Sequence, residues 1–175
     1  MVRIIAIRVV DRIKESGHTQ EVLSRHASVI KSRLGFHELN EDRCSREGYI
    51  LLYLKNNEKA IDALLDDLDR IYGIEVRHMN LGKEADRPVS VDPGSVISVV
   101  GMLISNRSAV VAEVQKTLTS FGCTIRTRLG INEEEQGEDL GLILLELTGE
   151  HDEMNKLVNR LNEIGDFPVE VISFN

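Results

Sequence analysis

The chain has 175 residues, of which 42% are hydrophobic and 29% are charged. This balance is ordinary for a globular protein and argues against wholesale disorder. Its 29 acidic residues outnumber the 21 Lys and Arg residues, and the net charge of −8 disfavours direct binding to a nucleic-acid backbone. The length allows either one domain or two small ones.

The two cysteines, Cys44 and Cys123, lack CxxC spacing and favour a reducing compartment over a disulfide framework. Residues 1–10 are short and interrupted by Arg3 and Arg8, so they do not predict a signal peptide. No apolar stretch reaches the roughly 18 residues of a membrane-spanning helix. We therefore expect a cytoplasmic protein without membrane partners.

In chain order, the first 81 residues predict strand, helix, two strands, helix and strand. A β-branched run at 4–10 precedes a polar turn and a helix, and the apolar segments 29–36 and 49–54 predict a hairpin. The second helix is marked by an apolar stripe, and residues 74–79 predict the last strand. The stripe consists of Ile61, Leu64, Leu65, Leu68 and Ile71.

The same order of elements returns after residue 94. Strands are predicted at 96–104, 124–131, 142–147 and 169–174, with helices after the first and third of them. The first helix ends at Gly122, a residue typical of helix C-termini. The helices carry apolar stripes, Val111, Val114, Leu118 and Phe121 in the first and Met154, Leu157, Val158, Leu161 and Ile164 in the second.

The two sets of elements are copies of one sequence. Ile30–Glu38 falls on Ile125–Glu133 at a shift of 95 residues, with five of nine positions identical. Gly48–Leu54 falls on Gly141–Leu147 at a shift of 93, with five of seven identical. Agreement over a whole structural unit indicates tandem duplication. We expect repeat 1 at residues 1–81, a linker rich in Pro and Gly at 82–94, and repeat 2 at 95–175.

The predicted fold class is α+β, as two tandem ferredoxin-like βαββαβ units. Right-handed crossovers give each unit a four-stranded antiparallel sheet of order 4-1-3-2, with both helices on one face. Residues 49–54 are apolar at every position, so we expect the helix-free face to be covered as well. A homodimer or an intramolecular pseudo-dimer would provide that cover.

Short motifs in both halves resemble a known family. The first strand is followed by Asp11-Arg12 or Asn106-Arg107, and the second ends in Arg33-Leu34-Gly35 or Arg128-Leu129-Gly130. With an Ile/Leu-rich third strand, these features resemble ACT-like proteins, and more narrowly the iron-only hydrogenase system regulators. That family's fold is close to the C-terminal domain of the nickel-responsive regulator. The resemblance implies a regulatory role, here in a duplicated chain. The sequence shows no helix-turn-helix or ribbon-helix-helix pattern, so direct DNA binding is not implied.

Six residues are candidates for binding a small anionic or amino-acid-like ligand. Arg12 and Arg107 follow the first strands, where a helix N-terminus suits a carboxylate or phosphate, although a solvated loop arginine is the simpler interpretation. Arg33 and Arg128, with Gly35 and Gly130, could line a pocket at an interface between units. The alternative is that each arginine points outward from a strand and that each glycine supplies a bulge or a turn with positive φ.

The first copy differs from the second in two other ways. Its first helix has Ser16 and Thr19 where the second copy has Val111 and Val114, which predicts weaker packing. It also contains Cys44 and four histidines, His18, His26, His37 and His78, whose spacing argues against a metal site. His26 takes the place of Phe121 and is interpreted as a packing residue. The acidic run 133–139 of the second copy predicts a solvated hairpin loop.

The leading hypothesis is a non-enzymatic regulatory or sensor protein that binds a small ligand or a partner protein and needs no cofactor. Two alternatives are an acylphosphatase-like enzyme and a metal-binding sensor of the nickel type. The acylphosphatase loop is poorly matched by Val10–Gly17, because that reaction needs a Gly-rich anion loop with an Arg and an Asn. An RNA-recognition module is opposed by the acidic charge, and Leu142 and Glu146 replace Tyr49 and Tyr53 in the second copy.

Overall fold

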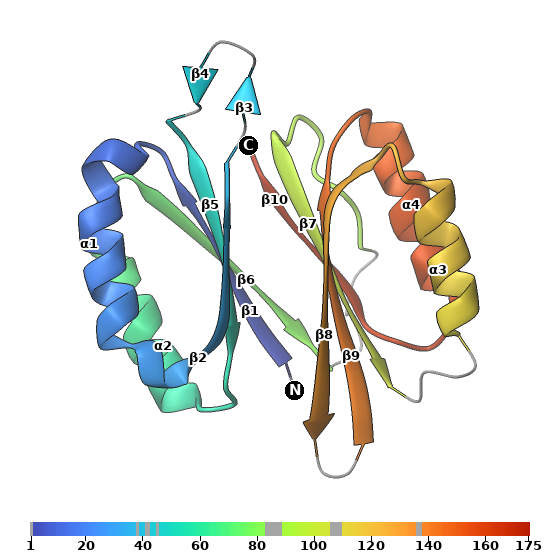
Figure 1. The fold of residues 1–175 in the computed structure, drawn as a ribbon, viewed down its shortest axis with the longest axis horizontal. Coiled ribbons are helices and arrows are strands. Elements are labelled where there is room, and N and C mark those ends of the chain that lie inside the picture. Colours follow the sequence, from blue (N-terminus) through green and yellow to red (C-terminus); the bar gives the residue numbers. More distant parts are fainter. Residues whose placement is uncertain are drawn as a thin grey trace. The chain divides into compact units, whose positions relative to one another are not determined.

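The computed structural model describes residues 2–37, 39–40, 43–44, 46–82, 89–105, 110–135 and 138–175. The chain divides into two compact units, Met1–His78 and Met79–Asn175 (Figure 1). Arg107 and residues 83–88 of the predicted linker lie outside the described part. None of the described helices is long and apolar enough to cross a membrane.

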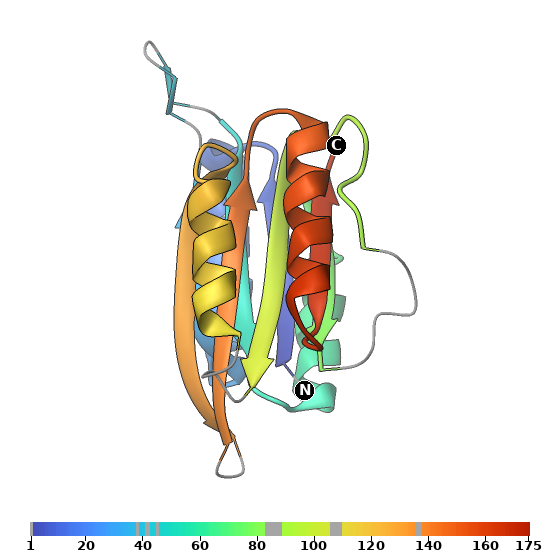
Figure 2. The same ribbon diagram turned by 90° about the vertical axis from the view of Figure 1, so that its right-hand side faces the viewer.

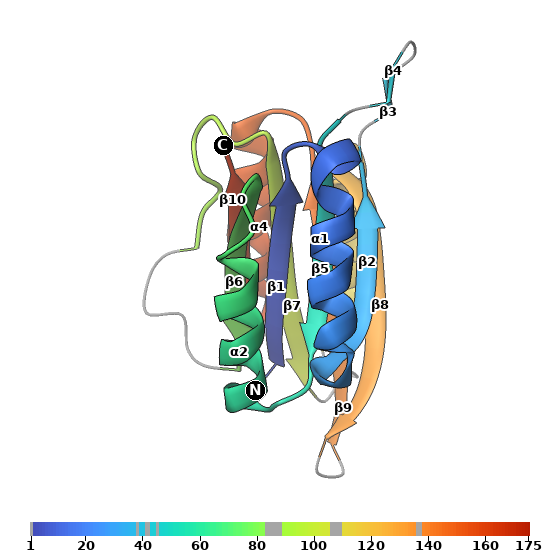
Figure 3. The same cartoon turned by 90° about the vertical axis from the view of Figure 1, so that its left-hand side faces the viewer.

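The first unit contains a four-stranded sheet of order β2-β5-β1-β6 and two helices that lie over one of its faces (Figure 3). Strand β6 runs three residues past the division between the units. Its elements are β1 (Val2–Val9), α1 (Arg12–Arg25), a 3-10 turn (Ala27–Val29), β2 (Ile30–Phe36), β3 (Leu39–Asn40), β4 (Arg43–Cys44), β5 (Gly48–Leu54), α2 (Glu58–Leu68) and β6 (Ile74–Leu81).

The second unit repeats this arrangement with the order β10-β7-β9-β8, and its helices also cover one face (Figure 2). Both orders are the predicted 4-1-3-2, so the tandem ferredoxin-like fold is confirmed. The elements are β7 (Ile97–Ser105), α3 (Val111–Ser120), β8 (Ile125–Glu135), β9 (Glu138–Leu147), α4 (His151–Ile164) and β10 (Val169–Phe174).

The helices of the first unit begin where side chains can cap them. Asp11 Oδ1 accepts a hydrogen bond from the amide of Ile13 at 3.1 Å, and Asn57 Oδ1 accepts one from the amide of Ala60 at 3.2 Å. Each cap satisfies an amide that has no partner within the helix. The chain therefore turns from strand into helix at a defined residue in both places.

Strand alternation places one set of apolar residues beneath the helices. In the first unit, Ile5 lies opposite Leu52 in the β1–β5 ladder, and both belong to a buried cluster that includes Leu64 of α2. The intervening residues Ala6 and Leu51 are also paired and point to the opposite face. Both faces of the central strands are thus apolar, as the sequence predicted.

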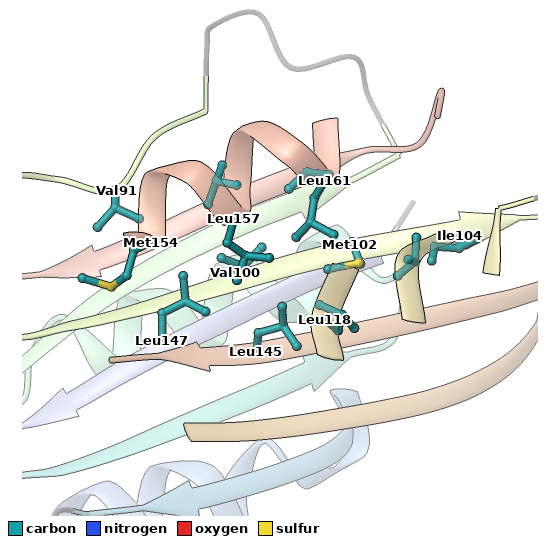
Figure 4. Close-up of a cluster of buried hydrophobic side chains, with 13 residues drawn as sticks. Val91, Val100, Met102, Ile104, Leu118, Leu145, Leu147, Met154, Leu157 and Leu161 are labelled. Carbon is teal, nitrogen blue, oxygen red and sulfur yellow. The ribbon is translucent and has the colours of Figure 1, made fainter. Parts of the chain in front are cut away.

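The second unit has an equivalent cluster (Figure 4), which includes Val100, Leu145 and Leu157. Val91 also belongs to this cluster, although it comes from the segment that we assigned to the linker. Its amide donates to Asn155 Oδ1 at 2.9 Å, and the amide of Gly94 donates to His151 Nε2 at 3.2 Å. The segment before β7 is therefore anchored to helix α4.

The described part of the acidic run in the second copy lies in strands, whereas we predicted a loop. Strand β8 continues to Glu135 and β9 begins at Glu138, so that Glu134 lies opposite Asp139 in the ladder. The hairpin extends because the antiparallel register set by Leu129 and Leu144 continues outward without interruption.

We predict that Leu64→Ala lowers the free energy of unfolding by about 2–5 kcal/mol, because the substitution leaves a cavity beneath α2. Leu64 is fully buried in the first unit, whereas Tyr72 of the same unit is 92% exposed. Tyr72→Ala is therefore the control, with an expected change within about 0.5 kcal/mol. Urea unfolding followed by circular dichroism measures both. Equal effects of the two substitutions would contradict the assigned core.

Candidate functional site

A groove in the first unit brings together residues of α1, β2 and β5. It has a volume of about 450 Å³, and its lining includes Ser16 and Gln20 from α1, Arg33 and Gly35 from β2, and Ile50 from β5. In the ladder, Arg33 lies opposite Leu52 and Gly35 lies opposite Ile50. Directly paired residues share a face, so Arg33 and Gly35 belong to the helix-covered side of the sheet.

The second unit has a groove in the same place, with a volume of about 180 Å³. Its lining includes Val111, Gln115, Arg128, Gly130 and Ile143, which are the counterparts of the five residues named for the first groove. Arg128 lies opposite Leu145, and Gly130 lies opposite Ile143, so the ladder positions also match. The duplicated chain therefore contains the same groove twice, each lined by residues of a single unit.

A hydrogen bond between side chains bridges each groove from the helix to the edge strand. Arg33 Nη1 donates to Gln20 Oε1 at 2.8 Å in the first unit. Arg128 Nη1 donates to Gln115 Oε1 at 3.0 Å in the second. The bridging pair is identical in the two units, although the helices that supply the glutamines differ at several neighbouring positions.

The bridge determines what kind of group the groove can bind. A guanidinium group only donates hydrogen bonds, so the glutamine atom that faces it must be the carbonyl oxygen. The oxygen is thereby occupied, and what the pair still offers consists of guanidinium and amide N–H groups. Such a surface suits the oxygens of a carboxylate or phosphate. Among the residues that the structure describes, neither Arg33 nor Arg128 forms an ion pair with a carboxylate.

The two glycines of the grooves are not required by the backbone. Neither Gly35 nor Gly130 has a positive φ, and the irregularities of the β2 and β8 ladders lie earlier, at Ile30–Ser32 and Ile125–Thr127. The interpretation of these glycines as bulge or turn residues was therefore wrong. A Cβ atom at Gly35 would meet only the Tyr49 carbonyl oxygen, at 3.9 Å, and one at Gly130 would meet nothing within 4 Å. Each glycine keeps the floor of its groove open.

The other two predicted ligand residues are not brought to the grooves by any described contact. Arg12 is the first residue of α1, but its side chain is outside the described part of the structure. Arg107 lies outside the described residues altogether. The interpretation of both as anion-binding residues stays a prediction.

Two larger hollows lie between the paired helices, and ion pairs cross them. The hollow between α3 and α4 has a volume of about 720 Å³ and includes Glu113 and Arg160, which pair at 3.2 Å. The one between α1 and α2 has a volume of about 560 Å³ and includes Arg25 and Asp67, which pair at 3.2 Å. Because the arginines of these hollows are already paired with carboxylates, the smaller grooves with their uncompensated arginines are better candidates.

His26 packs between α1 and α2 as predicted. Its side chain is 14% exposed, and Nε2 lies 2.8 Å from Asp67 Oδ2. Asp67 also pairs with Arg25 and with Arg70 at 3.1 Å. The hydrogen bond with His26, more than those with the arginines, holds the pKa of the Asp67 carboxyl below its ordinary value. The described residues contain no group of three His, Cys, Asp or Glu side chains that could hold a metal ion.

Sequence reasoning missed the glutamines of the grooves. Gln20 and Gln115 are identical at the shift of 95 residues that revealed the repeat, so the alignment already contained the signal. Their helical position, 13 residues before each arginine, gave no reason to connect them with strand residues. Only the packing of the helix against the edge strand makes the connection.

Comparison with known proteins supports the resemblance found in the sequence. Residues 96–171 match the family described as “TM1266-like: Iron-only hydrogenase system regulator, putative”. The match covers the second unit from β7 into β10 and includes Gln115, Arg128 and Gly130. The predicted resemblance to this family is thus confirmed for the second unit. No curated protein matches the chain.

Solved structures that match the chain include an uncharacterized protein, TM1266, from Thermotoga maritima. It is 29% identical, and the match covers 45% of this chain and 92% of that chain with a TM-score of 0.39. The acetolactate synthase small subunit from Thermotoga maritima is 12% identical, and the match covers 100% of this chain and 97% of that chain with a TM-score of 0.35. A chlorite dismutase from Candidatus Nitrospira defluvii is 11% identical, and the match covers 99% of this chain and 90% of that chain with a TM-score of 0.38.

We predict that Gly35→Ala and Gly130→Ala leave the free energy of unfolding unchanged or raise it by up to about 1 kcal/mol, because alanine loses less conformational freedom on folding. Gly73→Ala is the control, because Gly73 has a φ of 82° and its Cβ would lie 3.2 Å from the Glu15 side chain. That variant should lose about 1 kcal/mol or more. Thermal and urea unfolding measure all three. A loss at Gly35 as large as at Gly73 would show that the groove glycine is structural.

A second prediction concerns acid stability. Because the folded pKa of Asp67 is depressed, its contribution to stability is present above the unfolded pKa of about 3.9 and is lost as the pH falls through the lower folded pKa. The stability difference between wild type and Asp67→Asn should therefore shrink as the pH is lowered from about 6 to about 3. Urea unfolding across this range measures it, with the exposed Asp62→Asn on the same helix as control. A difference that stays constant with pH would exclude this linkage.

Proposed function

We propose that the chain is a non-enzymatic regulatory protein that binds a small anionic ligand in the grooves beside Arg33 and Arg128. The observation that carries the proposal is the repeated arrangement of an arginine bridged to a glutamine above an open glycine. A hydrogen bond that served only to hold the helix against the strand would not require a glycine beside it. The empty space next to unused N–H donors supports a role in binding.

The family match supports the regulatory part of the proposal. The second unit matches a family described as regulators of the iron-only hydrogenase system, and that unit contains one of the two grooves. We therefore place the protein's role in the control of such a system, with the grooves as the sites that sense a metabolite. A homodimer or an intramolecular pseudo-dimer that covers the apolar helix-free faces is part of the same proposal.

Catalysis in the grooves is less well supported. His37 lines the first groove, but Asn132 takes its place in the second, and Ser16 is replaced by Val111. A proton acceptor or a nucleophile would therefore be available in only one of two otherwise equivalent sites. The residues that the grooves share, Arg, Gln and Gly, can bind and orient an anion but cannot accept a proton from a substrate.

A thermal-shift screen tests the proposal. The probes are acetate, phenylacetate, L-amino acids, inorganic phosphate and phenylphosphate, each at a fixed ionic strength. A ligand at about 100 times its Kd stabilises the folded state by about 2.7 kcal/mol, which corresponds to a rise in Tm of about 5–10 °C for a chain of this size. We expect at least one of these anions to raise the Tm of the wild-type protein.

Arginine variants connect that response to the grooves. Arg33→Ala with Arg128→Ala removes the guanidinium donors and their positive charge from both grooves and should abolish the rise in Tm. Arg70→Ala with Arg160→Ala is the matched control, because it also removes one exposed arginine from each unit. The control should respond like wild type. No response to any anion, or a response that survives in the groove variant, would contradict the proposed function.

A further inference from the structure

Three exposed positions, along β2 and just beyond its end, line the first groove. They are Arg33, Gly35 and His37, and they alternate with the half-buried Leu34 and Phe36. Alternation puts the three exposed residues on one face of the strand, with the glycine in the middle. At about 3.3 Å per residue, the Cα atoms of Arg33 and His37 are roughly 13 Å apart. The open space above Gly35 thus has a basic side chain on either side.

The two basic side chains differ in how they are held. Arg33 Nη1 donates to Gln20 Oε1 at 2.8 Å, which keeps the guanidinium toward helix α1. The His37 side chain forms no hydrogen bond or ion pair with any residue that the structure describes. Both nitrogen atoms of a protonated imidazole are donors. His37 can therefore donate to an anionic group other than the one that Arg33 binds.

No carboxylate is among the described residues that line this groove. Helix α1 contributes only uncharged side chains to the lining, and β5 contributes one titratable group, Tyr49. The Tyr49 hydroxyl donates to Glu47 Oε2 at 3.3 Å, and the Glu47 carboxylate pairs with Arg8 at 3.0 Å. The carboxylate next to β5 is thus already paired with an arginine.

The described acidic residues near the start of α1 are also engaged elsewhere. Asp11 caps the helix and lies 3.6 Å from Arg46, and Glu15 lines the hollow between α1 and α2 instead of this groove. The side chain of Arg12 and the whole of Glu38 lie outside the described part. Among the described residues, a negative charge for His37 therefore has to come from a ligand.

The second groove lacks the second basic group. Arg128, Gly130 and Asn132 occupy the same three positions, so that an amide replaces the imidazole of His37. An amide can donate a hydrogen bond but stays uncharged. A histidine gains a positive charge as the pH falls from about 8 to about 5. The two grooves therefore share one cationic group and differ in whether a second one can form.

Building on the function proposed above, we infer that the first groove binds a dicarboxylate, with one carboxylate at Arg33 and the other at protonated His37. Gly35 has no side chain to fill the space between the two groups. The second groove binds a single carboxylate at Arg128 and does not distinguish dicarboxylates from monocarboxylates. The first unit accordingly recognises a doubly charged ligand, and its affinity falls as His37 loses its proton at higher pH.

Amide NMR titrations of the full chain with glutarate and butyrate test this inference, because Gly35 and Gly130 report on the two grooves separately. The titrations are run at constant ionic strength at about pH 6 and about pH 8, where most glutarate carries both charges. At the lower pH, Gly35 should report an affinity for glutarate about threefold or more above that for butyrate, and this ratio should shrink at the higher pH. Gly130 should report a smaller ratio that does not change with pH.

Reciprocal variants connect the preference to one position. His37→Asn should reduce the ratio at Gly35 to that at Gly130, and Asn132→His should give Gly130 the larger, pH-dependent ratio. His18→Asn is the matched control, because it removes from the same unit a histidine that is 75% exposed and does not line the groove. The control should titrate like wild type. A dispersed amide spectrum shows that each variant is folded.

Two kinds of failure can be told apart. Equal affinities of glutarate and butyrate at Gly35 at about pH 6, or a preference for glutarate that persists in His37→Asn, would overturn the dicarboxylate inference and leave anion binding intact. The same holds if Asn132→His leaves the ratio at Gly130 unchanged. Absence of any shift of either glycine with both probes would instead contradict the proposed function itself.

Discussion

Each unit depends on the burial of one face of its two central strands beneath a pair of helices. Ile5 and Leu52 in the first unit, and Val100 and Leu145 in the second, are fully buried on this side of their sheets. Removing such side chains from water is the largest favourable contribution to folding. The helices must therefore lie over the central strands, and the outer strands β2 and β8 are covered less completely. The alternation of exposed residues along β2 reflects this incomplete cover.

The grooves are a consequence of that placement. A helix centred over the middle of a twisted sheet diverges from the end of an edge strand, and side chains must bridge the gap or leave it open. In both units a hydrogen bond between a glutamine of the helix and an arginine of the edge strand bridges the gap. Two residues further along the strand, a glycine leaves the gap open. An exposed hydrogen bond of this kind contributes only about 1 kcal/mol to stability, so stability alone is a weak reason for the pair.

Duplication gives the chain an internal comparison that a single unit would lack. The bridging pair and the glycine are the same in both units, while the walls around them differ in size and polarity. The residues that would hold an anion are thus common to the two sites, and the residues that would contact the rest of a ligand are not.

Much of the architecture could be predicted from the sequence, because strand and helix periodicities are local properties. The repeat at shifts of 95 and 93 residues, the order of the elements and the apolar stripe from Ile61 to Ile71 all follow from spacing along the chain. The repeat also identified four candidate residues, because they occupy matching positions in the two copies: Arg33, Arg128, Gly35 and Gly130. The roles of these residues could not be predicted, since Gly35 resembles a bulge glycine until its φ and its surroundings are known.

The duplicated βαββαβ order and the set of residues common to both copies thus follow from the sequence without any structure. Only packing in three dimensions brings Gln20 to Arg33 across a gap that has beneath it a glycine without a positive φ. The physical reason is that periodicity depends on neighbours along the chain, whereas the distance between a helix and an edge strand depends on how the whole core packs beneath them.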